Sequence, residues 1–357
     1  MTFSVIIPVY NAEKYIDGAL KPVIAARNNG CELEAVLVEN GSEDGSAMIC
    51  DRYAEQYDFI KVNHFGNIGA FRARLEGMKL ATGDYLVFAD ADDELSEDCF
   101  AELSESIAAY GIRDITPDLV IYNAADSRDR NNKLFSFPFE QGKVYQGEEK
   151  RVFYDIMSSS DALNAMWNKA VRRDFIRETD SFDGLLLNHG EDLLQTAEFI
   201  DKAETIVYID KALYYYNQNS AGLTGSFHRE YMDNQVKAWK MFDKYIEKWH
   251  RDGDGYWDIL DKRKTLTCAI AVKSLIYSGI RRTDIARYLK EMMAMPFYQE
   301  YAGKELPEWA PEGDVFVYDL MNSDKPYRDL MRSATKFGIK STVKKILGWK
   351  EDVNNGN

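Results

Sequence analysis

The chain has 357 residues, 45% hydrophobic and 29% charged, which is typical of a globular protein with a full hydrophobic core. Its formal net charge of −15 argues against general nucleic-acid binding, because neutralising phosphates requires a basic face. Four scattered cysteines indicate free thiols in a reducing compartment, and no apolar run reaches the roughly 18 residues of a membrane span. The N-terminus leads into a strand pattern rather than a signal peptide, so we expect a cytoplasmic protein.

The first hundred residues alternate between strand and helix patterns. Asn11 follows the first strand and is a candidate N-cap for the helix after it. This alternation predicts βαβ units, and therefore an α/β fold with a mostly parallel sheet and helices on both faces. Strands are expected at 3–10, 33–38, 59–63 and 85–88, and helices at 12–27, 46–57, 67–81 and 97–110.

Polar side chains follow three of these strands where each strand ends. Asn11 follows the first strand and Glu39 ends the second, while three carboxylates, Asp90, Asp92 and Asp93, follow the fourth. In a parallel sheet these strand ends share one edge, which is where ligands bind. Like charges this close repel unless a cation lies between them, which favours a divalent metal site. The alternative is an acidic loop before a helix N-cap, and the triplet alone leaves both readings open.

The second part of the chain continues the pattern and then changes composition. Glu191 and Asp192 begin a helix, where the helix dipole favours carboxylates. From about Arg229 long helical patterns follow, so we place a boundary near residue 226. The expected organisation is a domain over 1–226, a helical C-terminal region over 227–350 and a polar tail over 351–357. The further expected elements are a strand at 117–123, a hairpin or loop at 126–133, a helix at 147–158, a strand or strand–helix junction at 166–173, strands at 205–209 and 212–216, and helices at 230–249, 256–278 and 283–293.

Eight short blocks, in order over residues 3–225, resemble glycosyltransferase family 2. The C-terminal third of the chain carries no such block. The first five blocks are Ser4-Val-Ile-Ile-Pro-Val-Tyr-Asn, Glu39-Asn-Gly-Ser-Glu-Asp-Gly-Ser, Asn67-Ile-Gly-Ala-Phe-Arg-Ala-Arg, Ala81-Thr-Gly-Asp-Tyr and Phe88-Ala-Asp-Ala-Asp-Asp. The later blocks, which resemble the bacterial polysaccharide branch, are Trp167-Asn-Lys, Gly190-Glu-Asp-Leu and Tyr214-Tyr-Tyr-Asn-Gln-Asn-Ser.

This resemblance implies a GT-A fold, which is Rossmann-like, with a nucleotide-sugar half over about 1–123 and an acceptor half over about 124–226. The implied activity is that of an inverting hexosyl- or N-acetylhexosaminyltransferase. It would move a sugar from a nucleoside diphosphate sugar, with a UDP-sugar preferred, to a glycan or lipid-linked glycan hydroxyl in cell-surface polysaccharide synthesis.

The resemblance also implies roles for single residues. Asp90 and Asp92 match the Asp-x-Asp motif and would hold Mn²⁺ or Mg²⁺, with Asp92 the direct ligand and Asp90 acting through water or the ribose. Asp93 would support these ligands or contact the acceptor. Asp192 matches the catalytic base, and Glu191 would orient it or contact the acceptor; the alternative is that both only favour the helix N-terminus. The implied nucleotide-binding residues are Pro8, Tyr10, Asn11, Glu39, Asn67, Gly69, Arg74 and Asp90.

Two departures from the family pattern put the identity of the base in doubt. Asn40 replaces the second residue of an acidic pair, and Leu75 replaces an asparagine. On the acceptor side, Trp167 could stack on a sugar and His189 could adjust the base, although each could equally be structural. A non-catalytic sugar-nucleotide-binding or scaffold protein is therefore an alternative. A nucleotidyltransferase is another, although the Gly- and Arg/Lys-rich phosphate loop that it normally carries is missing.

The C-terminal end is locally basic. Residues 323–350 hold eight Lys or Arg against two Asp, and apolar residues are interleaved with the lysines of 327–350. Such a segment could be an interfacial helix at the inner face of the cell membrane, or a helix packed on its own domain.

Overall fold

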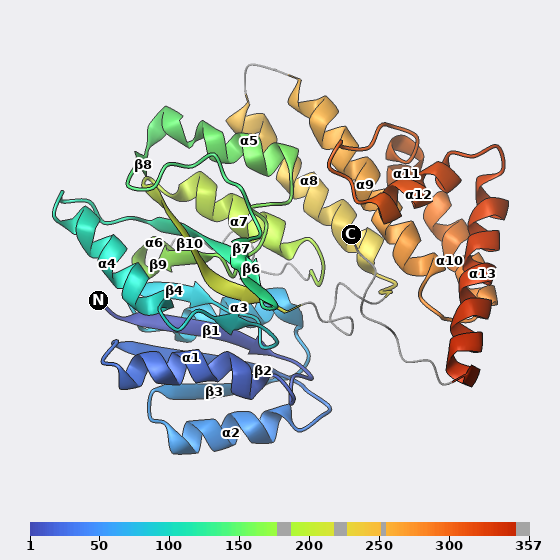
Figure 1. Cartoon of the computed structure of the whole chain (residues 1–357). Helices are drawn as coiled ribbons and strands as arrows, with labels where there is room; N and C mark the ends of the chain where they lie inside the picture. The colour runs from blue at the N-terminus through green and yellow to red at the C-terminus, as the bar shows by residue number, and fades with distance from the viewer. Residues whose placement is uncertain (177–186, 218–226, 251–254, 348–357) are drawn as a thin grey trace. The chain divides into compact units, whose positions relative to one another are not determined.

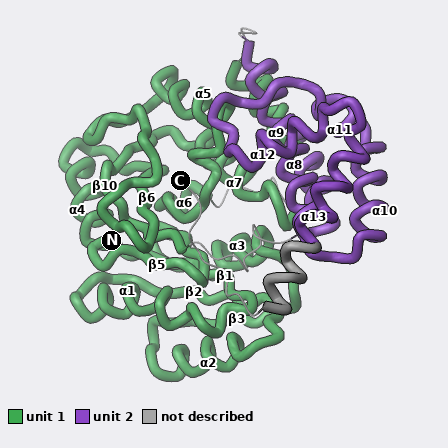
Figure 2. Tube along the Cα trace, turned by 45° about the vertical axis from the view of Figure 1, so that its right-hand side comes forward, with its two compact units in different colours: residues 1–219, 241–251 green, residues 220–240, 252–357 purple. Residues whose placement is uncertain are grey.

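The computed structural model describes residues 1–176, 187–217, 227–250 and 255–347, with the backbone alone for 339–347 (Figure 1). The chain divides into two compact units (Figure 2). Unit 1 comprises residues 1–219 and 241–251, and unit 2 comprises residues 220–240 and 252–357. Helix α8 (Tyr231–Trp249) contributes residues to both. The boundary near residue 226 and the tail 351–357 lie outside the described residues, so the domain division stays a prediction.

Unit 1 is built on one sheet, whose strand order is β3-β2-β1-β4-β9-β6-β10-β5, with β7 paired to β6 and β8 to β10. Strands β1 to β4 pair in parallel, as the alternating pattern predicts. Strand β9 is antiparallel to both of its neighbours, β4 and β6. The strands are β1 (Phe3–Val9), β2 (Leu33–Asn40), β3 (Ile60–Phe65), β4 (Tyr85–Phe88), β5 (Glu94–Leu95), β6 (Leu119–Asp126), β7 (Asp129–Lys133), β8 (Val144–Tyr145), β9 (Lys169–Arg172) and β10 (Ile206–Tyr216).

Helices cover both faces of this sheet. On one face, Val5 of β1 belongs to the same buried cluster as Leu20 of α1 and Phe100 of α4. On the other face, Ile6 lies under α3, close to Gly77. A strand buried on both sides is expected to be apolar throughout, which explains the run of apolar residues in β1. The helices of this unit are α1 (Ile16–Asn28), α2 (Ser46–Gln56), α3 (Gly69–Leu80), α4 (Cys99–Gly111), a 3-10 turn (Gly147–Lys150), α5 (Arg151–Ser159), α6 (Arg173–Ile176) and α7 (Glu191–Lys202).

The structure corrects two local expectations. Helix α1 begins at Ile16 rather than at residue 12, and Asn11 has a left-handed φ of 49° instead of capping it. The two strands expected at 205–209 and 212–216 form the single strand β10, whose register with β6 shifts between Ile209 and Tyr214. A strand that absorbs such shifts interrupts the apolar alternation, which is why the sequence pattern divides it in two.

Unit 2 is helical, as the composition of the C-terminal region predicts. It contains α9 (Tyr256–Ile276), α10 (Arg282–Met293), α11 (Pro296–Tyr301), α12 (Glu312–Met321) and α13 (Pro326–Leu347). Helix α9 packs against the other four, around a core of fully buried residues that includes Val272, Leu289, Val317 and Leu330. The short helices α11 and α12 were not predicted.

Two further findings concern the whole chain. None of the helices in the described ranges is long and apolar enough to cross a membrane. The four cysteines, all within the described residues, form no disulfide.

Candidate active site

The first part of the site joins the ends of β1 and β2. The backbone N–H of Asn11 donates to Ser42 Oγ at 3.1 Å, and Asn11 Oδ1 accepts from the N–H of Glu43 at 2.8 Å. Beside them, Tyr10 keeps 42% of its surface exposed. The left-handed backbone of Asn11 is therefore used to connect two strand ends, which asparagine tolerates better than most residues. These contacts bring Tyr10, Asn11 and the loop after β2 to one edge of the sheet.

Glu39 offers a charged acceptor at this edge. It is only 4% exposed, and its carboxylate accepts the N–H of Ser42 at 2.6 Å. Burial opposes its ionisation, but hydrogen bonds led by the one from Ser42 outweigh burial, so the pKa of Glu39 is lowered. His64 Nδ1 lies 3.4 Å from the same carboxylate and Nε2 lies 2.8 Å from Asp51, whose hydrogen bond raises the pKa of His64. An ionised Glu39 can accept hydrogen bonds from a nucleobase imide or a ribose hydroxyl.

The loop before α3 depends on an asparagine and a glycine. Asn40 Oδ1 accepts the N–H of Ile68 at 2.8 Å, so the carboxamide that departs from the family pattern fixes the start of α3. Asn67 Oδ1 accepts the N–H of Gly69 at 3.3 Å. Gly69 has a φ of 79°, and a Cβ there would lie 2.1 Å from Asn188 Oδ1, so any other residue would strain the backbone and displace the Asn188 side chain. The loop thereby approaches the segment that leads into α7.

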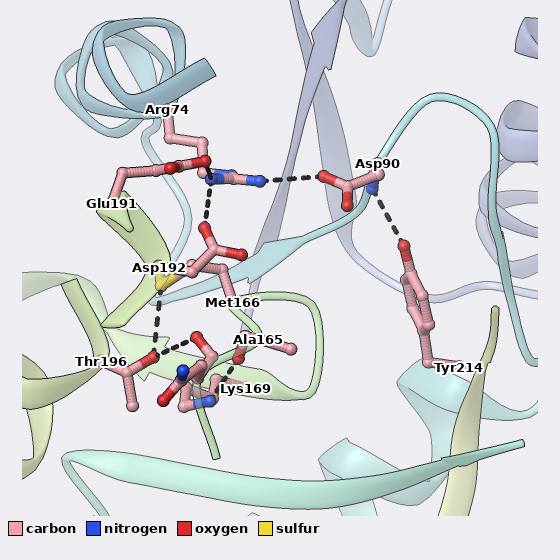
Figure 3. A network of polar contacts seen from close by, with 10 residues as sticks. Arg74, Asp90, Ala165, Met166, Lys169, Glu191, Asp192, Thr196 and Tyr214 are labelled. Atoms are coloured by element: carbon pink, nitrogen blue, oxygen red, sulfur yellow. Dashed lines mark hydrogen bonds and ion pairs between the residues drawn. The ribbon is translucent and has the colours of Figure 1, made fainter. Parts of the chain in front are cut away.

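Arg74 lies at the centre of the site (Figure 3). Its side chain, 5% exposed, extends from α3. It donates to Asp192 Oδ1 at 2.6 Å and to Asp90 Oδ1 at 3.1 Å, and it lies 3.7 Å from Glu191 Oε1. One guanidinium therefore connects the first aspartate after β4 with both carboxylates at the start of α7. The sequence named these residues as candidates, and the structure brings all four together.

The two carboxylates of α7 differ in exposure and so in what they can do. The side chain of Asp192 is 31% exposed, whereas that of Glu191 is 11% exposed. Burial raises the pKa of Asp192, and the charge of Arg74 partly opposes this. Burial and the charge of Asp192 raise the pKa of Glu191 to about 7. Asp192 is thus the accessible carboxylate; Arg74 favours its ionised form, which can accept a proton.

Lys169 is a buried cation below Asp192 whose role the sequence analysis missed. Its ammonium donates to the backbone oxygens of Leu163, at 2.8 Å, and Ala165, and to Asn168 Oδ1 at 2.7 Å. Burial lowers its pKa to about 7, while the charge of Asp192 acts in the opposite direction. The available signal was a lysine directly before two apolar residues of a short predicted strand.

The loop that Lys169 holds is also fixed from α7. Thr196 Oγ1 donates to the backbone oxygen of Asn164 at 2.9 Å. Figure 3 shows Lys169 and Thr196 on the side of Asp192 away from Asp90. Together they fix the helix turn that carries the accessible carboxylate.

The turn after β4 presents two carboxylates and buries a third. Asp90 has 35% of its side chain exposed and Asp92 is half-buried, whereas Asp93 is 2% exposed. Tyr214 Oη donates to Asp93 at 2.7 Å and accepts the N–H of Asp90 at 3.1 Å. Asn217 donates its N–H to Asp93 at 2.6 Å and its side-chain amide to the Asp92 carbonyl at 2.7 Å. Asp90 and Asp92 thus offer the hard oxygen ligands that Mn²⁺ and Mg²⁺ prefer.

Asp93 has a different environment from its two neighbours. Burial, followed by the charge of Asp90, raises its pKa to about 8. Its carboxylate faces Tyr214 and Asn217, so it fixes the shape of the turn. Both partners belong to the block that begins at Tyr214, although the block alone gives neither of them a role; Tyr214 lies near the end of β10 and Asn217 follows it directly.

The remaining acceptor-side candidates lie at the edge of this network. Trp167 is 8% exposed and stacks on Tyr214 with ring centroids 4.6 Å apart and planes 5° apart. His189 is also 8% exposed and precedes Gly190, the left-handed N-cap of α7. Both are close in sequence or space to the central carboxylates, and their contact with an acceptor stays a prediction.

Comparisons with known proteins point to one family. Residues 4–175 match the model described as glycosyl transferase family 2, a range that includes Arg74 and Asp92 but ends before α7. The chain is 28% identical to the uncharacterized glycosyltransferase YibD of Escherichia coli K12, over 68% of this chain and 70% of YibD. It is 25% identical to the putative glycosyltransferase EpsH of Bacillus subtilis 168, over 84% of this chain and 86% of EpsH.

A solved structure shares the fold. Residues 1–349 of Staphylococcus aureus TarS, in complex with UDP-GlcNAc, align with a TM-score of 0.58 and 17% sequence identity. The alignment covers all of this chain and 95% of that one. The fold is therefore of the GT-A type, as in residues 1–349 of TarS, and it includes C-terminal helices.

Proposed function

We propose a donor, a reaction and catalytic roles for this chain, which belongs to glycosyltransferase family 2 and is a glycosyltransferase. The proposed reaction moves a sugar from a UDP-sugar to an acceptor hydroxyl with inversion at the anomeric carbon. The observation that carries it is the position of Arg74, which contacts Asp90 and Asp192 with two nitrogens of one guanidinium. Such an arrangement supports a donor on the Asp90 side and an acceptor on the Asp192 side.

In the proposed reaction, Asp192 accepts the proton of the acceptor hydroxyl. The acceptor oxygen forms a bond to the anomeric carbon while the bond from that carbon to the diphosphate oxygen breaks. The nucleoside diphosphate leaves with the electron pair, and a single displacement inverts the anomeric centre. Arg74 favours the ionised form of Asp192 before the acceptor arrives, and Glu191 restricts its orientation.

Asp90 and Asp92 would hold Mn²⁺ or Mg²⁺, because they are half-buried oxygen ligands on a turn that Tyr214 and Asn217 fix. When bound, the ion would neutralise charge on the leaving diphosphate. In this proposal Asp93 maintains the turn.

The proposed nucleotide site is the edge formed by the ends of β1 and β2. Glu39 would accept from the base or ribose, with Pro8, Tyr10, Asn11, Asn67 and Gly69 around it. Uridine nucleotides come first among candidates because an ionised carboxylate can accept a hydrogen bond from the uracil imide N–H. The proposed acceptor is a glycan or lipid-linked glycan of surface polysaccharide synthesis, met at the inner face of the membrane, with 327–350 as a peripheral contact.

The central test replaces the proposed base. Asp192→Asn should lower kcat by about 10²–10⁴-fold, because a positioned base contributes about that much, while the affinity for donor and Mn²⁺ stays unchanged. Activity is measured as nucleoside diphosphate release, and donor affinity by calorimetric titration. A panel of nucleotide sugars with and without Mn²⁺, read as thermal shift, identifies the donor first.

The matched control is Asp98→Asn, the same substitution at the exposed residue that precedes α4. It should leave both quantities unchanged. Near-normal turnover by Asp192→Asn would remove Asp192 from the mechanism. Donor binding by the unmodified chain without any turnover, across the acceptors tried, would favour the sugar-nucleotide-binding scaffold instead.

A further inference from the structure

Helices α10 and α13 of unit 2 border a groove with a volume of about 720 Å³. This size lies within the roughly 300–1,000 Å³ of small-molecule sites. Half-buried Ala286 from α10 and buried Met331 from α13 form part of its floor. Four exposed cationic side chains also line it, namely Arg282, Arg328, Arg332 and Lys336.

The charge of the groove is opposite to that of the chain. None of the described residues lining it is acidic, although the whole chain carries −15. The acidic residue in contact with these cations is Asp329, whose Oδ1 lies 3.0 Å from Arg328 Nε and 4.0 Å from Arg332 Nη1. One carboxylate shared by two arginines leaves the groove with an excess of positive charge.

The second acidic residue nearby, Asp284 on α10, is already paired. Its carboxylate lies 2.8 Å from Arg281 and 3.1 Å from Arg287, neither of which lines the groove. It therefore does not offset the four lining cations. An anion approaching this acidic protein would find a favourable field here.

We propose that this groove binds an anionic phospholipid of a membrane surface. The phosphate would lie among the cationic side chains and the first acyl carbons would contact Ala286 and Met331. A free phosphate would use the cations alone, and an acidic peptide would not need an apolar floor between them. Cations beside an apolar surface are the combination that interfacial helices use at anionic membranes.

The spacing of the cations along α13 is suited to a membrane surface. Arg328, Arg332 and Lys336 recur every four residues along α13, which places them in one row on the helix. Each step of four residues turns about 40° around the helix axis, so these three positions span about 80° and can face one lipid surface together.

The lipid site rests on the peripheral membrane contact proposed above, but it uses no residue of the transfer reaction. Its test therefore measures vesicle binding, so that failure of the transferase mechanism and failure of the lipid site are distinguishable. The full chain is floated with vesicles of pure phosphatidylcholine, and with vesicles in which about one third of the lipid is phosphatidylglycerol. We expect binding only to the second, and binding that weakens as salt rises.

The charge variant is R282E/K336E, which reverses the charge of one exposed lining residue on each of the two helices. It should lower the partition coefficient for phosphatidylglycerol vesicles by about tenfold or more, since each basic residue near an anionic surface contributes about fivefold. The control K237E/K240E makes the same charge change at exposed residues of α8 and should lower binding by less than about threefold. Equal losses in the two variants would overturn the groove as the site.

A second variant tests the floor without changing charge. Ala286→Phe fills the groove and should lower binding several-fold if acyl carbons enter it, while near-unchanged binding would overturn the proposed contact with the floor. Far-ultraviolet circular dichroism and thermal melting establish that each variant is folded. Binding to neither vesicle, or equal binding to both, would also overturn the proposal.

Discussion

Arg74 determines the charge balance of the candidate active site at the scale of single residues. A buried guanidinium is unfavourable unless charged partners compensate for its lost hydration. Here Asp192, Asp90 and Glu191 provide that compensation, and their charges raise the pKa of Arg74 against the effect of burial. The same contacts favour ionised carboxylates, so arginine and carboxylates stabilise one another's charged forms.

Replacing this arginine by lysine should change the pH dependence of the reaction. In Arg74→Lys a single ammonium cannot reach Asp90 and Asp192 together, so the pKa of Asp192 rises further. A base acts in its deprotonated form, so a higher pKa of Asp192 lowers the activity at low pH. We expect the acidic limb of the kcat profile to move to higher pH by about one unit, so that kcat falls by up to about tenfold at pH values below the limb and little above it.

Donor affinity measured by calorimetry separates this role from direct nucleotide binding. If Arg74 acts mainly on Asp192, donor affinity changes little, whereas a large loss with an unmoved pH profile would assign Arg74 to the nucleotide. Arg52→Lys makes the same substitution at an exposed arginine, 61% exposed and 3.6 Å from Asp17, and should alter neither quantity.

The sequence identified the carboxylates of the site but not the residues that fix them. Asp90, Asp92 and Asp192 stand out because each belongs to a short motif at the end of a predicted strand or the start of a predicted helix. Tyr214 is more than 120 positions from Asp93, and Lys169 resembles an ordinary strand residue until its three acceptors are seen. Contacts of this kind depend on tertiary packing, which no local pattern contains.

At the scale of elements, the approach of α3 to the sheet depends on Gly77. A Cβ at this position would lie 2.4 Å from Ile6 Cγ2 and 3.2 Å from Val38 Cγ2. Arg74 is on the same helix, so the depth at which α3 packs also determines how far the guanidinium reaches. A glycine that a helix would ordinarily exclude is used here for close packing.

Gly77→Ala should lower the free energy of unfolding by about 1–2 kcal/mol, because overpacking outweighs the gain in helix propensity. It should also lower kcat, since α3 must move outwards and carry Arg74 with it. Gly111→Ala is the control, because nothing lies within 4 Å of the Cβ added at this helical position. That variant should be neutral or more stable by up to about 1 kcal/mol in urea unfolding. Equal stability of the two variants would contradict the packing argument.

Element periodicity predicted most of the helices and strands, and failed where tertiary contacts override it. The alternation of the first hundred residues is regular because β1 to β4 are joined by helices that each cross one face. The antiparallel entry of β9 between β4 and β6 has no sequence signature, since direction in a sheet is not a property of a single strand. Likewise, α1 begins later than the sequence pattern predicts, because Asn11 accepts a hydrogen bond from the loop after β2 instead of capping the helix.

At the scale of the whole molecule, the two units have separate hydrophobic cores. The core of unit 1 lies around the sheet, and that of unit 2 around α9. The residues assigned to donor binding and proton transfer all belong to unit 1. We therefore expect the donor site to depend little on the stability of unit 2.

Leu289→Ala tests this expectation within unit 2. The side chain is fully buried, so its truncation should lower the stability of unit 2 by about 2–5 kcal/mol. Donor affinity in the presence of Mn²⁺, measured well below the melting temperature, should remain within about twofold of the unmodified chain. The loss of stability is followed by calorimetry. A parallel loss of donor affinity would mean that unit 2 supports the site.

The position of β9 has a consequence for how the protein is made. β9 fills the space between β4 and β6, yet it is synthesised roughly 80 residues after β4 ends. At about 5–20 residues per second, the ribosome needs on the order of 4–16 s to deliver it. During this interval the nascent chain carries β4 with an unpaired, apolar edge, which is a site for mispairing between chains. Chaperone contact during translation should therefore be concentrated between the emergence of β4 and that of β9.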